Sequence, residues 1–170
     1  RSPERGPVGE FTPQGLRLFR EPRSYSNAVS EVGSIEAEIP ILTSGLGVSG
    51  AALRRVVGDF EDPAVDGIVV AGTGLGNTTG ALCATIEEAR AAGLPVVIAS
   101  RCHGGATAPL YGGDGGGTTL DEFDVLWAGD LPPWKARTKL AVALAIGDDD
   151  TDSAGIDEAF FERGNREPGR

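Results

Sequence analysis

Short apolar runs separated by helical patterns dominate the chain from residue 39 onward. Four runs rich in Val and Ile, at 39–43, 67–71, 95–99 and 125–127, are typical of strands buried on both faces. Apolar residues between and after them recur at helical spacing. Strand and helix therefore alternate. This predicts a parallel sheet with helices on both faces, because right-handed crossovers place each helix against the sheet.

The helical patterns carry their own start and stop signals. Ser49 is a candidate cap for the first, Gly93 ends the second, and Pro132-Pro133 starts the third. A last helix is predicted before a tail at 164–170. The apolar positions of the four helices are Leu53, Val56 and Val57; Leu82, Ile86 and Ala89; Ala136, Leu140, Ala143 and Leu144; and Ile156, Ala159 and Phe160.

The first 38 residues follow a different pattern. Apolar residues flank Thr12-Pro13-Gln14-Gly15, where Pro and Gly take the positions preferred in a type I turn, and this predicts a hairpin. The polar, non-periodic stretch 20–38 predicts a linker or surface loop. We therefore expect a hairpin and linker over 1–38, a three-layer α/β domain with a parallel sheet of about four strands over 39–163, and a tail over 164–170.

Composition excludes several classes of function. A net charge of −10 repels phosphate backbones and anionic lipid, so neither a nucleic-acid nor a membrane partner is expected. No apolar run approaches the roughly 18 residues that span a bilayer. Cys83 lies beside a helical apolar stripe and Cys102 is the only other cysteine, which argues against disulfides and favours the cytoplasm. The acidic, arginine-rich composition suits a halophile or a high-GC genome.

In a parallel α/β sheet, ligands bind beyond the carboxyl ends of the strands, which points to the loops 44–47, 72–79 and 100–105. The glycine-rich loop in 72–79 does not fit the dinucleotide fingerprint. Asn77 stands where that motif needs Gly or Ala, and Ser100-Arg101 follows the next strand where an acidic residue is needed. No nucleotide cofactor is expected, and a purely structural tight turn stays open as an alternative.

Other motifs have plain structural interpretations. Cys102-His103 lacks an assignable third group, and adjacent residues seldom face each other well enough for nucleophilic catalysis. The acidic run 148–152 imitates a calcium loop, but Ser153 replaces its glycine and Ala159 its bidentate Glu, so no metal is expected. The run 112–117 is either an ordered loop over a site or a flexible connector. Lys135 and Arg137 begin a helix, where cations are disfavoured unless they have partners.

Several segments, in order, resemble the bacterial and archaeal L-asparaginases. The strand 66–71 with its glycine loop, the next strand with its Ser-Arg turn, and the glycine run after Tyr111 all match. The resemblance continues into the third predicted helix and covers most of 6–147. The matching segments are Gly6-Pro7-Val8-Gly9, 66–77, 95–101 with Gly104-Gly105, 111–117, Ala128-Gly129-Asp130-Leu131 and 135–140.

The resemblance implies an amidohydrolase that converts L-asparagine, possibly also L-glutamine, to the acid and ammonia without metal or cofactor. The family's threonine nucleophile, second threonine and Asp-Lys pair lie in an N-terminal domain, so no catalytic residue is expected here and the fragment alone should be inactive. Because the chain starts at Arg1, we expect that domain upstream.

The family's C-terminal domain packs against the catalytic domain of a neighbouring subunit in a dimer or tetramer. Its glycine-loop asparagine, matched by Asn77, helps complete that subunit's substrate site, with Gly74 and Gly76 beside it. An amide both donates and accepts, so Asn77 is expected to hold the catalytic threonine region or the substrate's α-amino group. The residues expected to have structural or interface roles are Ser100, Arg101, Tyr111, Lys135 and Arg137.

The chain departs from the family at Leu75 and Thr78-Thr79. No acidic residue lies between Gly104 and Gly113, where some members supply one; Asp114 is the nearest, and no role is assigned to it.

Two other functions stay open: the asparaginase-like subunit of the archaeal glutamyl-tRNA(Gln) amidotransferase, and a stand-alone small-ligand or assembly module without enzyme activity.

Overall fold

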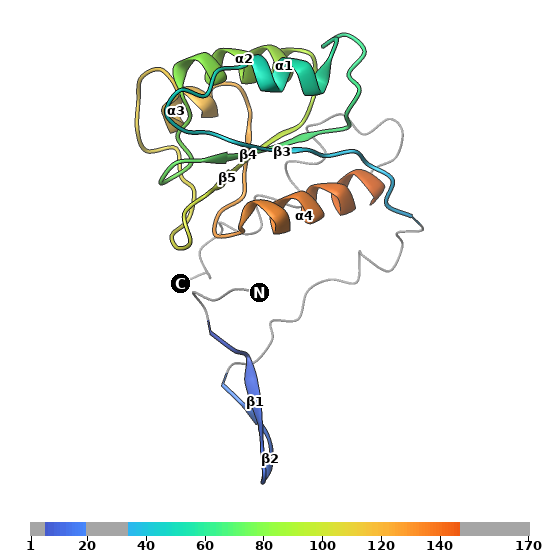
Figure 1. The fold of residues 1–170 in the computed structure, drawn as a ribbon, viewed down its shortest axis with the longest axis vertical. Helices are drawn as coiled ribbons and strands as arrows, with labels where there is room; N and C mark the ends of the chain where they lie inside the picture. The colour runs from blue at the N-terminus through green and yellow to red at the C-terminus, as the bar shows by residue number, and fades with distance from the viewer. Residues whose placement is uncertain (1–5, 20–33, 147–170) are drawn as a thin grey trace, which may run out of the picture.

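The computed structural model describes residues 6–19 and 34–146. Its centre is a four-stranded parallel sheet in the order β3-β4-β5-β6 (Figure 1). The strands are β3 Ile41–Thr43, β4 Ile68–Gly72, β5 Val96–Ser100 and β6 Leu126–Trp127. Each lies within two residues of the run that predicts it. The predicted parallel sheet is therefore confirmed.

Helices cover both faces of the sheet, which makes three layers (Figure 1). The helices α1 Ala51–Val57, α2 Gly80–Ala91 and α3 Gly117–Asp121 lie on one face, and α4 Pro133–Ile146 lies on the other. The strands follow chain order, so successive right-handed crossovers place α1, α2 and α3 on the same side. The helix α3 was not predicted. The predicted last helix and the tail lie outside the described residues.

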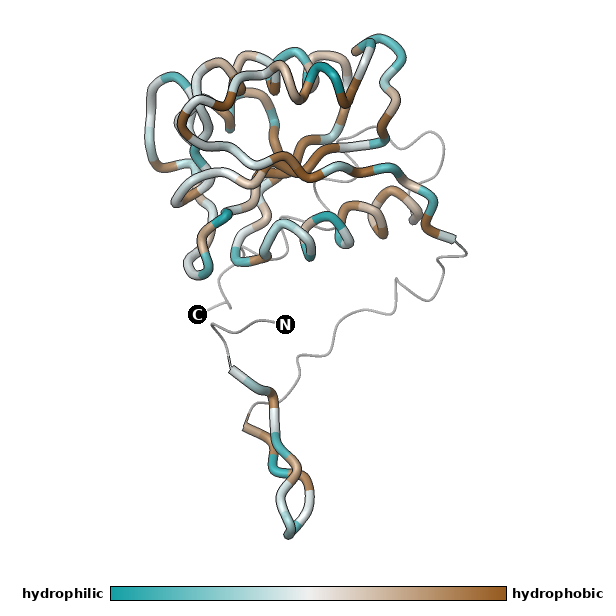
Figure 2. Tube along the Cα trace, viewed as in Figure 1, coloured by the Kyte–Doolittle hydropathy of each residue, from teal (hydrophilic) through white to brown (hydrophobic). Residues whose placement is uncertain are grey.

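Successive side chains along each strand point to opposite faces of the sheet and pack into two separate cores. Ile68, Val70 and Ile98 point toward the α1–α2 layer, whereas Val69 and Val97 point toward α4. Figure 2 shows the hydrophobic colour concentrated where the strands cross between the helical layers. The core on the α4 side contains several alanines, which let this helix lie close to the sheet: Ala99, Ala128, Ala136, Ala141 and Ala143.

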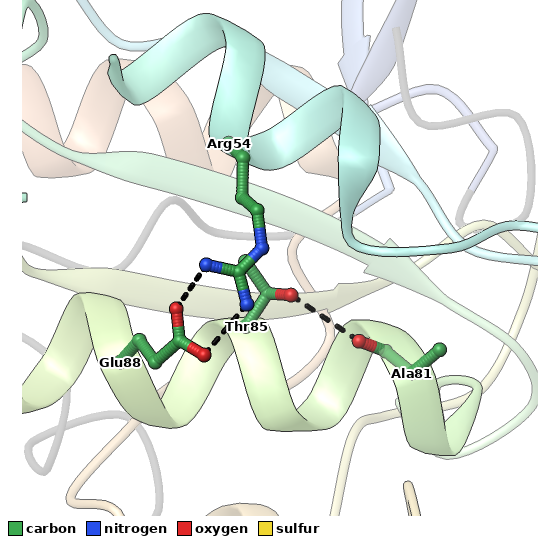
Figure 3. Close-up of polar contacts among 4 residues, drawn as sticks. All are labelled: Arg54, Ala81, Thr85 and Glu88. Carbon is green, nitrogen blue, oxygen red and sulfur yellow. Dashed lines mark hydrogen bonds and ion pairs between the residues drawn. The ribbon is translucent and has the colours of Figure 1, made fainter. Parts of the chain in front are cut away.

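An ion pair between Arg54 and Glu88, called here the α1–α2 clasp, joins α1 to α2 (Figure 3). The Arg54 guanidinium donates to both carboxylate oxygens of Glu88 and lowers the pKa of that carboxyl. Close by, Gly50 packs so tightly on the Thr85 side chain that any Cβ at position 50 would overlap it. Thr85 Oγ1 in turn donates to Ala81 O, 3.2 Å away.

The helix signals were mostly confirmed. Gly93 follows α2 with φ +83°, and α4 starts at Pro133 as expected. The predicted cap at Ser49 is wrong by one residue. The N-cap of α1 is Gly50, which the contact with α2 holds in place, although Ser49 Oγ still accepts from Ala51 N–H at 3.3 Å.

The predicted hairpin is confirmed as β1 Gly9–Thr12 and β2 Gly15–Leu18. Its register sets Phe11 opposite Leu16 and Glu10 opposite Arg17, so one face of the ribbon is apolar and the other polar. Phe11 is 89% exposed. The ribbon thus presents an apolar face of the kind that is normally buried, and a lone two-stranded hairpin is at best marginally stable.

Candidate functional site

The loops after β3, β4 and β5 meet at the carboxyl edge of the sheet. Ser100 Oγ donates to Gly74 O at 2.6 Å, and the Arg101 N–H donates to Gly72 O at 2.9 Å. The Arg101 guanidinium lies against Gly45, where an added Cβ would stand 3.2 Å from Nη1. Ser100 is buried and Arg101 exposed, so this edge combines a fixed buried hydroxyl with an exposed cation.

The glycine-rich loop after β4 is closed by reciprocal backbone bonds. Thr73 N–H donates to Asn77 O at 2.8 Å, and Asn77 N–H donates to Thr73 O at 2.9 Å. Gly74 and Gly76 have φ of +54° and +109°, which glycine adopts most readily. A Cβ on Gly76 would also lie 3.0 Å from Trp127 Cζ3, whereas the space at Gly74 is open. Asn77 is therefore presented by a tight and well-supported turn.

The Asn77 side chain is fixed by a bond to a distant loop. Its Oδ1 accepts from the backbone N–H of Gly117, the first residue of α3, at 3.1 Å. The N-cap position of α3 is Gly116, which has no side chain, so Asn77 supplies the capping oxygen. A backbone N–H requires an acceptor, and this settles which end of the amide is oxygen. The amino group, which carries the two donors, is the end that does not bind Gly117.

The glycine run before α3 is an ordered loop, not a flexible connector. Gly115, Gly116 and Gly117 are buried, and Thr78 N–H donates to Gly115 O at 2.8 Å. A Cβ on any of the three would overlap neighbouring backbone; on Gly117 it would stand 2.9 Å from Pro109 Cα. Gly115 therefore packs its backbone against Thr78 and Thr79, next to Asn77, whereas Gly116 and Gly117 pack against the backbone of 108–112.

Residues 38–160 match the family model of the glutaminase/asparaginase C-terminal domain. The chain belongs to this family.

Individual relatives agree with this assignment. The chain is 33% identical over 148 residues to a probable L-asparaginase of Deinococcus radiodurans, covering 84% of this chain and 42% of the relative. It is 28% identical over 146 residues to a glutamyl-tRNA(Gln) amidotransferase subunit of Methanothermobacter thermautotrophicus, covering 84% and 32%, and 30% identical over 150 residues to the corresponding protein of Haloquadratum walsbyi, covering 86% and 33%. The chain spans less than half the length of these relatives.

Within this asparaginase-type domain, most of the predicted interface residues lie near the Asn77 loop. Ser100 ends β5 and Arg101 follows it at the same edge, and Tyr111 precedes the glycine run and is exposed. Lys135 and Arg137 lie in α4, which covers the opposite face of the sheet; the first is half-buried and the second exposed.

The Asp114 side chain lies against Gly80 at the start of α2. The glycine run passes α2 before it reaches Asn77, and a Cβ on Gly80 would stand 3.0 Å from Asp114 Cβ. Gly80 is the first residue of α2, so the carboxylate sits at the positive end of that helix, where it is stabilised by the macrodipole.

Cys83 and Cys102 are both free thiols. Cys83 is buried in α2, and burial raises the pKa of its thiol, while Cys102 and His103 are exposed.

Within 6–19 and 34–146, no three His, Cys, Asp or Glu side chains gather closely enough to hold a metal ion. In the same residues, no helix combines the length and apolarity needed to cross a bilayer.

Three residues that shape the site were missed by the sequence analysis: Gly117, Asp121 and Trp127. The Gly117 N–H donates to Asn77 Oδ1, while Trp127 packs under Gly76 and donates from Nε1 to Asp121 Oδ1 at 2.7 Å. Signals existed for Gly117, which ends the glycine run 112–117, and for Trp127, a large aromatic residue at the end of a predicted strand, but none existed for Asp121.

Proposed function

We propose that the chain is the C-terminal domain of an L-asparaginase, which hydrolyses L-asparagine to L-aspartate and ammonia. The family match over 38–160 and the 33% identity to the Deinococcus protein support this proposal. The nucleophilic threonine, the second threonine and the Asp-Lys pair would then lie in an upstream catalytic half, to which the hairpin over 9–18 would also belong. The whole protein would be a cytoplasmic dimer or tetramer.

In this proposal Asn77 completes the substrate site of a neighbouring subunit. The observation that carries it is the bond from the Gly117 N–H to Oδ1, which occupies the carbonyl end of the amide and leaves the amino end as the donor for a ligand. Two N–H donors match an acceptor, such as a substrate carboxylate or a carbonyl of the catalytic loop, better than an ammonium group. Gly74, which is exposed, allows close approach of the substrate, and buried Gly76 shapes the loop.

The experiment that tests the function compares ammonia release from asparagine and glutamine. The two proteins are the 170-residue chain and a longer protein in which a catalytic half precedes it. We expect activity only in the longer protein, with asparagine preferred. Activity in the 170-residue chain, or none in an intact longer protein, would contradict the proposal.

A second function is favoured by two of the relatives, which are glutamyl-tRNA(Gln) amidotransferase subunits at 28% and 30% identity. Under this alternative the ammonia would pass to a misacylated transfer RNA in a complex. Co-purification of the longer protein with that RNA, and ammonia release stimulated by it, would replace the asparaginase proposal.

A further inference from the structure

Two contacts on opposite sides of Asn77 are joined to each other through α3. On one side, Oδ1 of Asn77 accepts from the N–H of Gly117, the first residue of α3. On the other side, Gly76 packs on the Trp127 indole, and Trp127 Nε1 donates to Oδ1 of Asp121, the last residue of α3. Gly76, Asn77, Gly117, Asp121 and Trp127 thus form a closed ring of contacts.

The short helix in this ring acts as a rigid spacer. It contains five residues, about one and a half turns, and is anchored in the core by Leu120, which is fully buried. Loss of the bond at its Asp121 end removes the restraint that holds the helix and the indole in register. The Gly117 N–H at the other end would then shift relative to the Trp127 indole under Gly76.

We propose that Asp121 and Trp127 are positioning residues that set the direction of the Asn77 amide. Neither contacts Asn77 itself; Asp121 acts through α3 and Gly117, and Trp127 acts through Gly76. The proposal rests on the role given to Asn77 in the proposed function. The carboxylate accepts a charge-assisted bond from the indole, and this bond fixes the orientation of the indole. Phe at 127 would lose both the donor and the Cζ3 atom that lies against Gly76.

The test is a double-mutant cycle on kcat/KM in the full-length, oligomeric protein. Asp121→Ala and Trp127→Phe are each expected to lower kcat/KM for asparagine by about three- to tenfold, the effect of one net hydrogen bond. Asp121→Asn keeps an acceptor oxygen for the indole and should recover most of the loss. In an Asn77→Ala background, Asp121→Ala should cost nothing further, because the group that it positions is gone.

A general loss of stability would give a different pattern. Its control is Glu88→Gln, which weakens the α1–α2 clasp without touching the ring; it should lower Tm and leave kcat/KM unchanged. Additive losses in the Asp121/Asn77 cycle, or normal kinetics in both Asp121→Ala and Trp127→Phe, would overturn the proposal while leaving the role of Asn77 intact. If Asn77→Ala itself leaves kcat/KM unchanged, the role of Asn77 is wrong and the positioning proposal falls with it.

Discussion

The backbone N–H of Gly117 donates to Oδ1 of Asn77 at 3.1 Å, across 40 residues of sequence. Under the proposed function, this side chain has two separable tasks. The oxygen caps α3, and the amino group is the part that would meet a ligand. Substitutions that keep the oxygen of this amide but remove its donors can therefore separate the stability of the domain from its proposed function.

Asn77→Asp and Asn77→Ala form a matched pair for this purpose. Aspartate keeps an oxygen for Gly117 and is favoured at a helix N-terminus, but it has no donor. We expect Asn77→Asp to retain the wild-type Tm and to lose activity, whereas Asn77→Ala should lose activity and also about 1–2 kcal/mol of the free energy of unfolding. Urea denaturation and ammonia-release kinetics of the full-length protein measure the two effects. Full activity in Asn77→Asp would show that the donors are not needed.

Gly76→Ala should destabilise the domain much more than Gly74→Ala. Both glycines have positive φ, so each alanine costs about 1–2 kcal/mol in backbone strain. At Gly76 the new Cβ would also press on Ile98 and Trp127, which adds about 1–3 kcal/mol of overpacking. Gly74 has open space and serves as the control. Equal losses in urea denaturation would mean that the packing under Gly76 is unimportant.

The two faces of the hairpin give another matched pair. If β1 and β2 pack on an upstream catalytic half, Phe11 becomes buried and Glu10 on the opposite face stays in solvent. In the full-length protein, Phe11→Ser should then cost about 3 kcal/mol of stability. Glu10→Ser should cost under about 1 kcal/mol, because it removes only the exposed pair with Arg17. A harmless Phe11→Ser would contradict the assignment of the hairpin to that half.

The buried thiol of Cys83 predicts a dependence of stability on pH. Burial raises its pKa in the folded state, whereas the unfolded thiol ionises near about pH 8.5. The folded state then holds the proton more tightly, so the stability present below about pH 8.5 declines as pH rises above it. Urea denaturation with a reductant between about pH 7 and 9.5 should show this decline.

Cys83→Ala provides the comparison for that measurement. The variant should be about 1 kcal/mol less stable at neutral pH because of the lost packing. It should also show a shallower decline toward alkaline pH than the wild type. Parallel pH profiles for the two proteins would assign the decline to other groups.

The regular elements were predictable because their signals are local. The Val- and Ile-rich run 95–99 encodes its own burial, and Pro133 and Gly93 mark helix ends through backbone conformations that they favour or permit. The helix α3 was not predictable in the same way. Its start at Gly117 depends on a capping oxygen that Asn77 supplies from a distant loop. A bond between residues so far apart leaves no local pattern.

The candidate site also combines features with a local sequence signal and features that depend on distant residues. The position of Asn77 at the carboxyl edge of the sheet follows from the strand before it, and the structure places it there. The direction of its amide depends on Gly117, and the shape of its loop on the indole of Trp127. Ser49 shows the opposite case, in which a local signal was present but misleading. Ser49 is a good local cap, yet the N-cap of α1 is Gly50, because Gly50 packs against Thr85 on α2.

The strands of the sheet lie side by side in the order in which a ribosome makes them. Ile41 pairs with Val69, Val69 with Val97 and Val97 with Leu126, and each pair is separated by fewer than thirty residues. No strand has to be inserted between two that are already paired. These pairings are non-local, but each closes a loop of similar length, so the entropy cost of closure is about the same for every added strand. The sheet can therefore grow one strand at a time from β3 during translation, each new unit covering the edge left open by the one before.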